Sequence, residues 1–446
     1  MHCSRELFCL GIICLLVGGH HMAEAGGLYT NPFDLENEWT NYGIGDPYIL
    51  RWNGRYYLYP STNTHYGGSM GIRTWISQDL INWDYAGYAT TEPVTKNAFA
   101  PEVVYWNGFF YMYTSPDGQG HYVLKSDRPT GPFTVQTDNL GLTIDGSVFI
   151  DDDGRWYFTH AGHLGIRGHR MADPYTVGPE RVLNSSLGGW TEGSYILKRN
   201  DLYYLTYTGN HLLSTGYRVH YSMSEEGPLG PYIVPEDDLI LISTKEGFSG
   251  LGHSATVLGP DLDSYYIVYH SMPIRFGPHL RKMNIDRLAF NGKRMMVLGP
   301  TNYPQKGPKL PEFYTWIDED GLSPHWIETK SGDSTLLLSR SKTGPDYTAE
   351  FNFAVTDKTA EGYMGTLFSY IDDQNFACVL LDLQEKSLEL QVTRQGQLMR
   401  LATASLFEEV DLTRLHTLRV VKYGDRMEIY FDNMRQFALD LKGVFG

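Results

Sequence analysis

Short segments in which apolar and polar positions alternate with a period of two, typical of β-strands, recur through the first three hundred residues, and no helical period of useful length appears there. Within this pattern, a turn residue followed by an aromatic doublet in an alternating strand occurs five times. The five segments are residues 53–59, 107–113, 153–158, 200–207 and 263–269. The first three contain Asn-Gly or Asp-Gly, the strongest short signal for a β-hairpin. The repeat is about 45 to 60 residues long, which predicts a propeller with five four-stranded blades.

A second pattern runs in phase with the first. A short apolar strand that opens with a polar or charged residue precedes each doublet. These opening residues are Asp46, Glu102, Asp145, Glu192 and His253, and they lie 9 to 13 residues before the second aromatic of their doublets. Each segment is expected to be the innermost strand of its blade, bordering the central channel. The five side chains are therefore predicted to converge, although about two hundred residues of chain separate the first from the last.

The remainder of the chain predicts a second domain. Residues 299–311 are rich in Pro and Gly, which indicates a boundary, with a propeller over residues 27–303 and a linker over residues 304–311. Beyond it, the segments that alternate or run apolar as strands are residues 334–339, 347–353, 376–381, 387–392, 416–421 and 427–432. They favour a β-sandwich over residues 312–446. The sequence stops directly after a strand, so a truncated sandwich is expected.

The N-terminus predicts export. Residues 1–25 combine Arg5, an apolar run over residues 7–17 and an Ala-Glu-Ala sequence at residues 23–25, the features of a signal peptide that is cleaved. Three of the four cysteines lie in this segment, so the mature chain keeps only Cys378 and has no internal disulfide or cysteine metal cluster. We expect a secreted, extracellular or periplasmic protein without a membrane anchor.

Charge and composition narrow the partners. The formal net charge is −16, which argues against nucleic acid and anionic membranes, because both need a basic surface. Aromatic residues make up 14% of the chain, including 32 Tyr and 9 Trp. This enrichment suits either a β-rich fold or stacking on the rings of a carbohydrate.

Three of the five channel positions suggest a chemistry. Asp46, Asp145 and Glu192 are each followed by Pro or Gly and then by an apolar strand. Hydrolysis of a glycosidic bond needs an acid for the leaving oxygen and a second carboxylate that activates water or attacks carbon. A third carboxylate helps the acid to keep its proton, because like charges resist ionising together. A capping or turn role is the alternative for any one of them, but the set of three favours a glycosidase.

The motifs at these positions resemble glycoside hydrolase family 43. They are Asp46-Pro, Phe99-Ala-Pro-Glu102, residues 144–154 around Asp145-Gly, residues 191–198 around Glu192-Gly, Gly252-His253-Ser-Ala, and residues 77–83. The resemblance covers about residues 30–305. It implies a five-bladed, inverting enzyme with Asp46 as general base, Glu192 as general acid and Asp145 as modulator of the acid's pKa. Inversion implies a base-to-acid separation of roughly 6.5–9.5 Å.

The resemblance also suggests supporting residues. His253 matches the channel histidine of the family, beside which Ca²⁺ is a candidate ligand; a hydrogen-bonded interior histidine is the alternative, and no cofactor is required. Glu102 is a candidate for substrate support or for a structural hydrogen bond. Arg281 resembles an arginine near the substrate, with surface solvation as the alternative. Three aromatic residues are candidates for the walls of the sugar pocket: Trp75, Phe99 and Trp190. Core packing is the alternative for each of them. Phe99 stands where the family often has Trp.

The second domain resembles concanavalin-like and laminin-G-like domains that accompany family 43 enzymes. The resemblance as a whole implies a secreted α-L-arabinofuranosidase or β-xylosidase acting on arabinose- or xylose-containing plant polysaccharides or oligosaccharides. The alternatives are a related enzyme active on galactan or another glycan and a non-catalytic carbohydrate-binding propeller. A retaining propeller of the fructan-hydrolysing type usually opens with Asn-Asp-Pro-Asn-Gly, from which Gly45-Asp46-Pro-Tyr48 departs.

Overall fold

The protein is all-β apart from one short 3-10 helix, η1 (Pro93–Thr95), in the described residues. The computed structural model describes residues 27–62, 69–214, 216–244, 248–273, 280–315, 317–318, 321–332 and 334–442. The predicted signal peptide, residues 1–25, and the last four residues lie outside these ranges. Within them, no helix has the length and apolar character needed to cross a bilayer.

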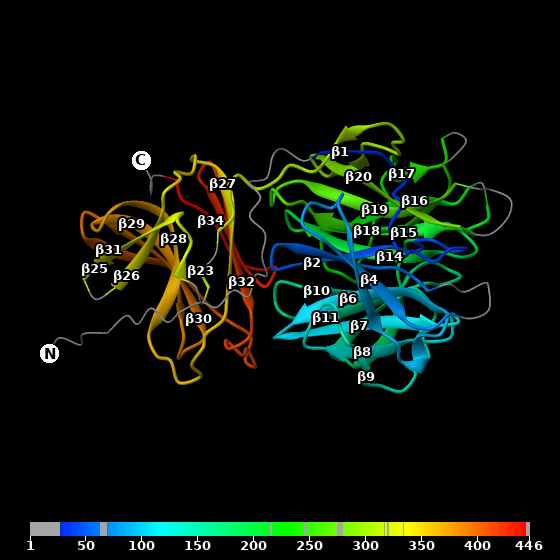
Figure 1. Ribbon diagram of the computed structural model, residues 1–446, viewed down its shortest axis with the longest axis horizontal. Helices are drawn as coiled ribbons and strands as arrows, with labels where there is room; N and C mark the ends of the chain where they lie inside the picture. The colour runs from blue at the N-terminus through cyan, green and yellow to red at the C-terminus, as the bar shows by residue number, and fades with distance from the viewer. Residues whose placement is uncertain are drawn as a thin grey trace. The chain divides into compact units, whose positions relative to one another are not determined.

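Five four-stranded sheets form the first unit, and in each the strands pair in sequence order (Figure 1). Blade I is β2 (Tyr48–Trp52), β3 (Arg55–Tyr59), β4 (Ile72–Ser77) and β5 (Asp84–Thr90); blade II is β6 (Ala98–Trp106), β7 (Phe109–Pro116), β8 (Tyr122–Ser126) and β9 (Thr134–Val135); blade III is β10 (Ser147–Ile150), β11 (Trp156–His160), β12 (Arg167–Asp173) and β13 (Thr176–Val182); blade IV is β14 (Glu192–Arg199), β15 (Leu202–Gly209), β16 (Arg218–Ser224) and β17 (Leu239–Ile242); blade V is β18 (Ser249–Leu258), β19 (Tyr265–Met272), β20 (Lys282–Asn291) and β21 (Arg294–Val297). The five occurrences of the repeat therefore predicted the number of blades, and the length of the repeat predicted the number of strands in each.

The aromatic doublets lie in the second strand of each blade and pack the blades together. Four of the five second aromatics are buried, and Tyr157 of blade III is partly exposed. Rings of neighbouring blades are in contact at Trp52–Phe110, Trp106–Trp156, Phe149–Tyr203 and Tyr204–Phe290. Blade V reaches blade I through the Tyr56 hydroxyl, which donates to the carbonyl of Leu258. Large aromatic rings at four of the five blade junctions therefore hold the sheets together, because each ring buries a large area.

Each inner strand has a residue with left-handed backbone conformation within it or two residues before it. The values of φ are +48° at Asp46, +42° at Ala100, +63° at Asp145, +56° at Gly193 and +46° at His253. For a residue other than Gly, this conformation costs on the order of 1–2 kcal/mol. Such strain is typical of functional sites, where the surrounding structure holds it in place.

The ring closes through both ends of the first unit. β1 (Leu28–Tyr29) pairs with β22 (Gln305–Lys306), and Asn31 exchanges two hydrogen bonds with the backbone of Ile285 in blade V. The predicted linker over residues 304–311 therefore needs correction, because its first residues are a paired strand of the propeller. The boundary between the two compact units lies between Pro311 and Glu312.

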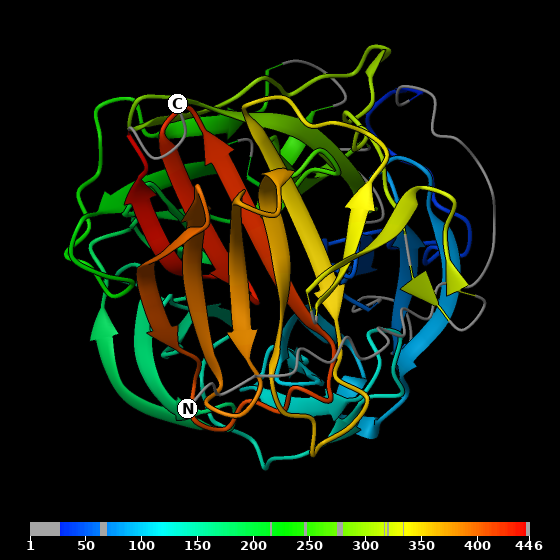
Figure 2. The ribbon, with the colours of Figure 1, turned by 90° about the vertical axis from the view of Figure 1, so that its left-hand side faces the viewer.

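The second unit contains two four-stranded antiparallel sheets. One has the order β27-β32-β33-β34, and the other has the order β28-β29-β30-β31. In Figure 2 these strands are coloured yellow to red. The bounds are β27 (Tyr347–Phe353), β28 (Tyr363–Asp372), β29 (Asn375–Asp382), β30 (Ser387–Arg394), β31 (Gln397–Ser405), β32 (His416–Tyr423), β33 (Arg426–Phe431) and β34 (Met434–Asp440); the short hairpins β23 (Ile317–Asp318)–β24 (Gly321–Leu322) and β25 (Trp326–Ser331)–β26 (Ser334–Ser339) precede them. Cys378 is buried in β29 as a free thiol.

Candidate active site

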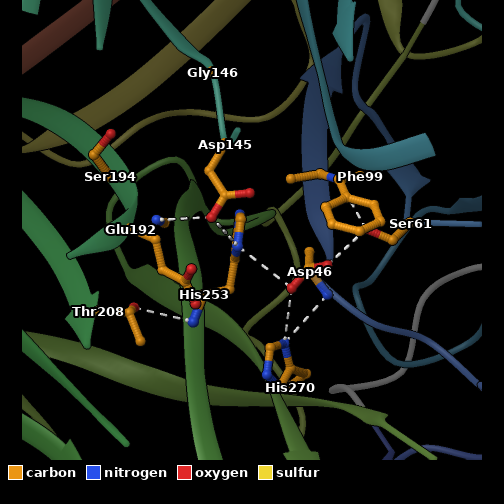
Figure 3. A network of polar contacts seen from close by, with 12 residues as sticks. Asp46, Ser61, Phe99, Asp145, Gly146, Glu192, Ser194, Thr208, His253 and His270 are labelled. Atoms are coloured by element: carbon orange, nitrogen blue, oxygen red, sulfur yellow. Dashed lines mark hydrogen bonds and ion pairs between the residues drawn. The ribbon is translucent and has the colours of Figure 1, made fainter. Parts of the chain in front are cut away.

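The predicted convergence of the inner-strand residues is present in the structure. Asp46, Asp145, Glu192 and His253 come from four different blades and meet in one network of polar contacts (Figure 3). His253 lies between two of the carboxylates: its Nδ1 is 3.3 Å from Oδ1 of Asp46 and 3.4 Å from Oδ2 of Asp145. Glu192 joins the network beside Asp145, since the backbone N–H of Gly193 donates to Oδ2 of Asp145 at 3.2 Å.

Asp46 is held as a carboxylate. Its Oδ2 accepts a hydrogen bond from Ser61 at 2.6 Å, and its Oδ1 lies 2.5 Å from Nη1 of the buried Arg281. Burial alone would raise the pKa of Asp46, but the charge of His253 and the contacts with His270 and Ser61 outweigh burial and lower it. The guanidinium of Arg281 acts in the same direction, because an adjacent positive charge favours the ionised form. An ionised carboxylate at this position can accept a proton.

The close approach of Arg281 depends on a glycine. A Cβ atom at Gly45 would lie 2.2–2.3 Å from the guanidinium of Arg281, so any larger residue would displace that group from Asp46. Arg281 also lies over the ring of Tyr42, with its Cζ 4.6 Å from the ring centroid. This placement supports the prediction of an arginine at the site and excludes surface solvation, since Arg281 is only 5% exposed.

His253 is held as a cation. Burial alone would lower the pKa of its imidazole, but the carboxylates of Asp145 and Asp46 outweigh burial and raise that pKa to about 10. The backbone N–H of His253 donates to the hydroxyl of Thr208 at 3.0 Å, which links the middle of β18 to β15 of the neighbouring blade. A cation shared between Asp46 and Asp145 lets two carboxylates lie close to each other in a buried site.

Glu192 has the opposite protonation state to Asp46. Burial and then the charge of Asp145 raise the pKa of Glu192 to about 8, against the opposing effect of its hydrogen bonds. Those bonds come from the indole N–H of Trp190, at 2.5 Å from Oε2, and from the hydroxyl of Tyr217, at 2.6 Å from Oε1. At neutral pH the carboxyl keeps its proton and is held in place by two donors. This is the state that a general acid needs.

Glu102 lies on the inner strand of blade II and is also protonated at neutral pH. Burial raises its pKa to about 8, although a hydrogen bond with Ser147 acts in the opposite direction. Its side chain is buried, and its Oε2 has no hydrogen-bond partner among the described residues. Glu102 therefore lies in the interior beside the network, which suits a supporting role.

The three aromatic candidates have different surroundings. Trp75 is fully buried in the hydrophobic core, where its ring packs on Tyr85 and its indole N–H donates to the carbonyl of Glu36. Its assignment as a wall of the sugar pocket is wrong, because no part of the ring is open to a ligand. Trp190 contacts Glu192 and lines a pocket of about 300 Å³. Phe99 is partly exposed and lies beside Ser61 and Asp46 in Figure 3.

Several residues of the network were not predicted. Ser61, Thr208 and His270 support Asp46 or His253, and each follows the repeat tyrosine of its blade (Tyr57, Tyr204 and Tyr266) by four residues. The repeat phase could therefore have identified these three. Tyr217 precedes the third strand of blade IV, and the sequence carries no signal for its contact with Glu192.

The donor set at His253 does not fit a metal ion. Its Nδ1 faces two carboxylates as an ion-pair donor, and Arg281 already contacts Asp46. Ca²⁺ requires six to eight oxygen ligands without a competing cation. In the part of the chain that the structure describes, the only group of three or more His, Cys, Asp or Glu that could hold a metal lies elsewhere. No step of the chemistry below passes through a metal.

The comparisons with known proteins agree with this geometry. The sequence model of glycosyl hydrolases family 43 matches residues 39–294, more than half of the chain. A β-D-galactofuranosidase of Aspergillus niger is 27% identical over 285 residues, which cover 55% of this chain and 79% of that protein. A xylan 1,3-β-xylosidase of a Vibrio species is 29% identical over 233 residues, which cover 44% of this chain and 42% of that protein.

Two solved structures extend the comparison. A thermostable family-43 glycoside hydrolase has 31% sequence identity and a TM-score of 0.56, covering 63% of this chain and 99% of its own. A family-43 protein of Bacillus licheniformis has 18% identity and a TM-score of 0.53, covering 95% of this chain and 92% of its own, which shows a likeness of fold. The propeller, the matched family model and these relatives together show that the chain belongs to glycosyl hydrolases family 43, and it is an inverting glycoside hydrolase.

Proposed function

We propose that this enzyme removes arabinofuranosyl or xylosyl units from plant polysaccharides or oligosaccharides, with Asp46 as general base and Glu192 as general acid. One observation carries the assignment of roles. The same network holds Glu192 protonated, with a pKa of about 8, and lowers the pKa of Asp46. An inverting enzyme needs this pair of opposite states, because one group gives a proton while the other takes one.

In the proposed reaction, the carboxyl of Glu192 donates its proton to the glycosidic oxygen as the bond from that oxygen to the anomeric carbon breaks. Water attacks the anomeric carbon from the opposite face of the ring and loses a proton to Asp46. The products are a sugar of inverted configuration and a free hydroxyl on the leaving group. Glu192 and Asp46 then exchange protons with solvent and return to their starting states.

Asp145 and His253 act in this scheme as positioning residues. The charge of Asp145 helps to raise the pKa of Glu192, and its carboxylate accepts the Gly193 N–H at the residue after the acid. His253 is the cation that contacts both Asp145 and Asp46, and its charge lowers the pKa of Asp46. Neither group needs to touch the sugar for the acid and the base to remain in their required states.

The proposed substrate class rests on the family relatives. Their names include β-xylosidase and arabinoxylan arabinofuranohydrolase as well as β-D-galactofuranosidase. A galactofuranosidase or another glycosidase of this fold is therefore the second candidate. We also propose that the protein is exported. The two four-stranded sheets of the second unit support the further proposal that this unit is a β-sandwich.

Activity on defined substrates tests the proposal. Wild-type protein is incubated with aryl α-L-arabinofuranoside, aryl β-xyloside, aryl β-D-galactofuranoside and linear arabinan, and the first product is followed by NMR. Turnover of a pentoside with inversion is expected. Turnover of the galactofuranoside alone would show that the substrate is a galactofuranoside and not a pentoside. Turnover of none of the four substrates would contradict both assignments.

Replacement of Asp46 by Gly tests the base. The variant is expected to lose hydrolysis of the accepted substrate and to regain turnover with added azide, which attacks without a base and gives a glycosyl azide of inverted configuration. Asp286→Asn is the matched control. Asp286 is also a buried aspartate, but it accepts hydrogen bonds from Tyr269 and Thr301 and is not part of the carboxylate network. An Asp46→Gly variant with unchanged hydrolysis would contradict the assignment.

A further inference from the structure

Two buried histidines and a glutamate lie together on blade III, outside the proposed carboxylate network. His160 ends β11, His169 is in β12 and Glu180 is in β13. His169 pairs directly with Glu180, and His160 pairs with Arg167, two residues before His169. Because side chains alternate along a strand, this register places all four side chains on one face of the sheet. The Nε2 atoms of the two histidines are only 2.9 Å apart.

The surroundings of His160 fix the position of its ring proton. Its Nδ1 lies 3.0 Å from the carbonyl oxygen of Ala161 and 2.5 Å from Oγ1 of Thr143. The hydroxyl of Thr143 donates its own hydrogen to the same carbonyl, so it can only accept from His160. Both neighbours of Nδ1 are therefore acceptors. The neutral imidazole carries its hydrogen on Nδ1 and a lone pair on Nε2.

His169 has the same tautomer for the same reason. Its Nδ1 is 2.9 Å from the carbonyl oxygen of Gly178, an atom that can only accept. Its Nε2 therefore also carries a lone pair. With these tautomers two lone pairs face each other at a distance typical of a hydrogen bond, and neither nitrogen has a hydrogen to donate. A metal ion or an extra proton between the two nitrogens would satisfy both lone pairs.

We propose that His160, His169 and Glu180 form a binding site for a divalent transition-metal cation such as Zn²⁺. Tetrahedral Zn²⁺ with bonds of 2.0–2.1 Å to nitrogen places its ligand atoms about 3.3 Å apart. The two Nε2 atoms need to separate by about 0.4 Å to reach that distance, and the half-exposed Glu180 needs a small side-chain rotation, since its Oε2 is 3.9 Å from Nε2 of His160. Ring N–H donation to backbone carbonyls is the usual support of a metal-binding histidine.

The charges and the space around the cluster agree with a bound dication. His160 and His169 are 2% and 3% exposed, so an extra proton shared between them would be a poorly solvated charge with one distant carboxylate. His160 and Glu180 both line the pocket of about 300 Å³, which gives a fourth ligand position access to solvent. The guanidinium of Arg167 also lines this pocket, and its Nη1 pairs with Oε1 of Glu180 at 3.3 Å, which leaves Oε2 for the metal.

Metal binding to the full chain tests this proposal without reference to glycosidase activity. The protein is stripped with a chelator, the bound metal is counted by mass spectrometry after exposure to Zn²⁺, and Co²⁺ is titrated while the visible spectrum is recorded. One ion per chain is expected, with the intense absorption of four-coordinate Co²⁺. His169→Gln is expected to weaken the affinity for the metal by about 100-fold. Loss of a residue that only supports a metal ligand typically weakens affinity by about 10–100-fold, and His169 is itself a proposed ligand.

Two further variants complete the experiment. Glu180→Gln, on a half-exposed side chain, is expected to weaken binding without affecting folding, and it replaces His169→Gln if that variant does not fold. His220→Gln is the matched control, because His220 also lies on the third strand of its blade and bonds to an acidic residue, Asp238. It is expected to bind like the wild type. Absence of stoichiometric binding by the wild type, or binding that neither His169→Gln nor Glu180→Gln weakens, would overturn the proposal and leave a shared proton between the histidines.

Discussion

The inner strands of blades II and IV each place a glutamate beside the same network, and the two glutamates differ in their surroundings. The pKa of both Glu102 and Glu192 is raised to about 8, and burial is the main cause in each case. Glu192 accepts hydrogen bonds from Trp190 and Tyr217, and Trp190 also lines an accessible pocket. Glu102 is sealed in the interior, with Oε2 unpartnered among the described residues.

The difference teaches that a raised pKa is required of a general acid but does not identify one. Burial is enough to keep a carboxyl protonated at neutral pH. Proton transfer to a substrate also needs a fixed orientation and access within hydrogen-bonding distance. Glu192 has a donor at each carboxyl oxygen and a neighbour that lines a pocket. Glu102 has a hydrogen bond with Ser147, but its Oε2 has no partner among the described residues. Substitutions at Glu192, Asp145, Tyr217 and Glu102 can separate these requirements.

The largest effect is expected for Glu192→Gln. The amide cannot donate the proton that the leaving group needs, so kcat/KM for an oligosaccharide should fall by about 10²–10⁴-fold. The loss should be smaller for an aryl glycoside whose leaving group needs no proton. Steady-state kinetics on both substrates measure the difference. Equal losses on the two substrates, or no loss, would show that Glu192 is not the acid.

Asp145→Asn is expected to follow. Removal of this negative charge lowers the pKa of Glu192, so the acid loses its proton at a lower pH than in the wild type. The alkaline limb of the kcat–pH profile, expected near pH 8 in the wild type, should move to lower pH, and activity at pH 8 should fall by roughly 10–100-fold. An alkaline limb that stays in place would mean that Asp145 does not act through the charge of Glu192.

Tyr217→Phe should have a smaller effect of opposite sign on the profile. The Tyr217 hydroxyl stabilises the ionised form of Glu192, so its loss raises the pKa of Glu192 and moves the alkaline limb to higher pH. The carboxyl also loses one of its two donors, so kcat should fall by several-fold, on the order of one lost hydrogen bond. Tyr204→Phe is the control, since that hydroxyl donates to the carbonyl of Lys293 away from the carboxylates.

The smallest effect on activity is expected for Glu102→Gln, since Gln resembles the protonated carboxyl that is present at pH 7. Its effect should instead appear in stability. The native pKa of about 8 exceeds the ordinary value of 4.5, so the folded protein binds more protons than the unfolded chain between these pH values. Stability is then highest below pH 4.5, as far as this group is concerned, and decreases as the pH rises towards 8.

Glu102→Gln removes this contribution, so the variant should lose less stability than the wild type between pH 5 and pH 8. The difference should be on the order of a few kcal/mol at most. Chemical denaturation at the two pH values measures it, and the unchanged Glu192 retains its own similar contribution in both proteins. Identical pH dependence, or a loss of kcat as large as that of Glu192→Gln, would remove the distinction between the two glutamates.

Sequence reasoning identified the repeat and the five inner-strand positions because the signals are local. Alternation and Asn-Gly turns act over a few residues, and their regular recurrence placed Asp46, Asp145, Glu192 and His253 on equivalent strands. The same reasoning treated Trp75 as a candidate for the wall of the sugar pocket. An aromatic residue in a strand gives the same sequence pattern whether its side chain faces a ligand or the core. It also missed the strand at Gln305–Lys306, which is two residues long and pairs with the other end of the propeller.

Protonation states were decided only by the tertiary structure. The pKa of Glu192 depends on burial, on Asp145 from another blade and on Tyr217, which lies 25 residues further along the chain. The contact of Arg281 with Asp46 spans 235 residues. Sequence alone therefore determined where carboxylates could meet, whereas folding decided which of them keeps its proton, because desolvation and charge act through space and sum over groups that are distant in the chain.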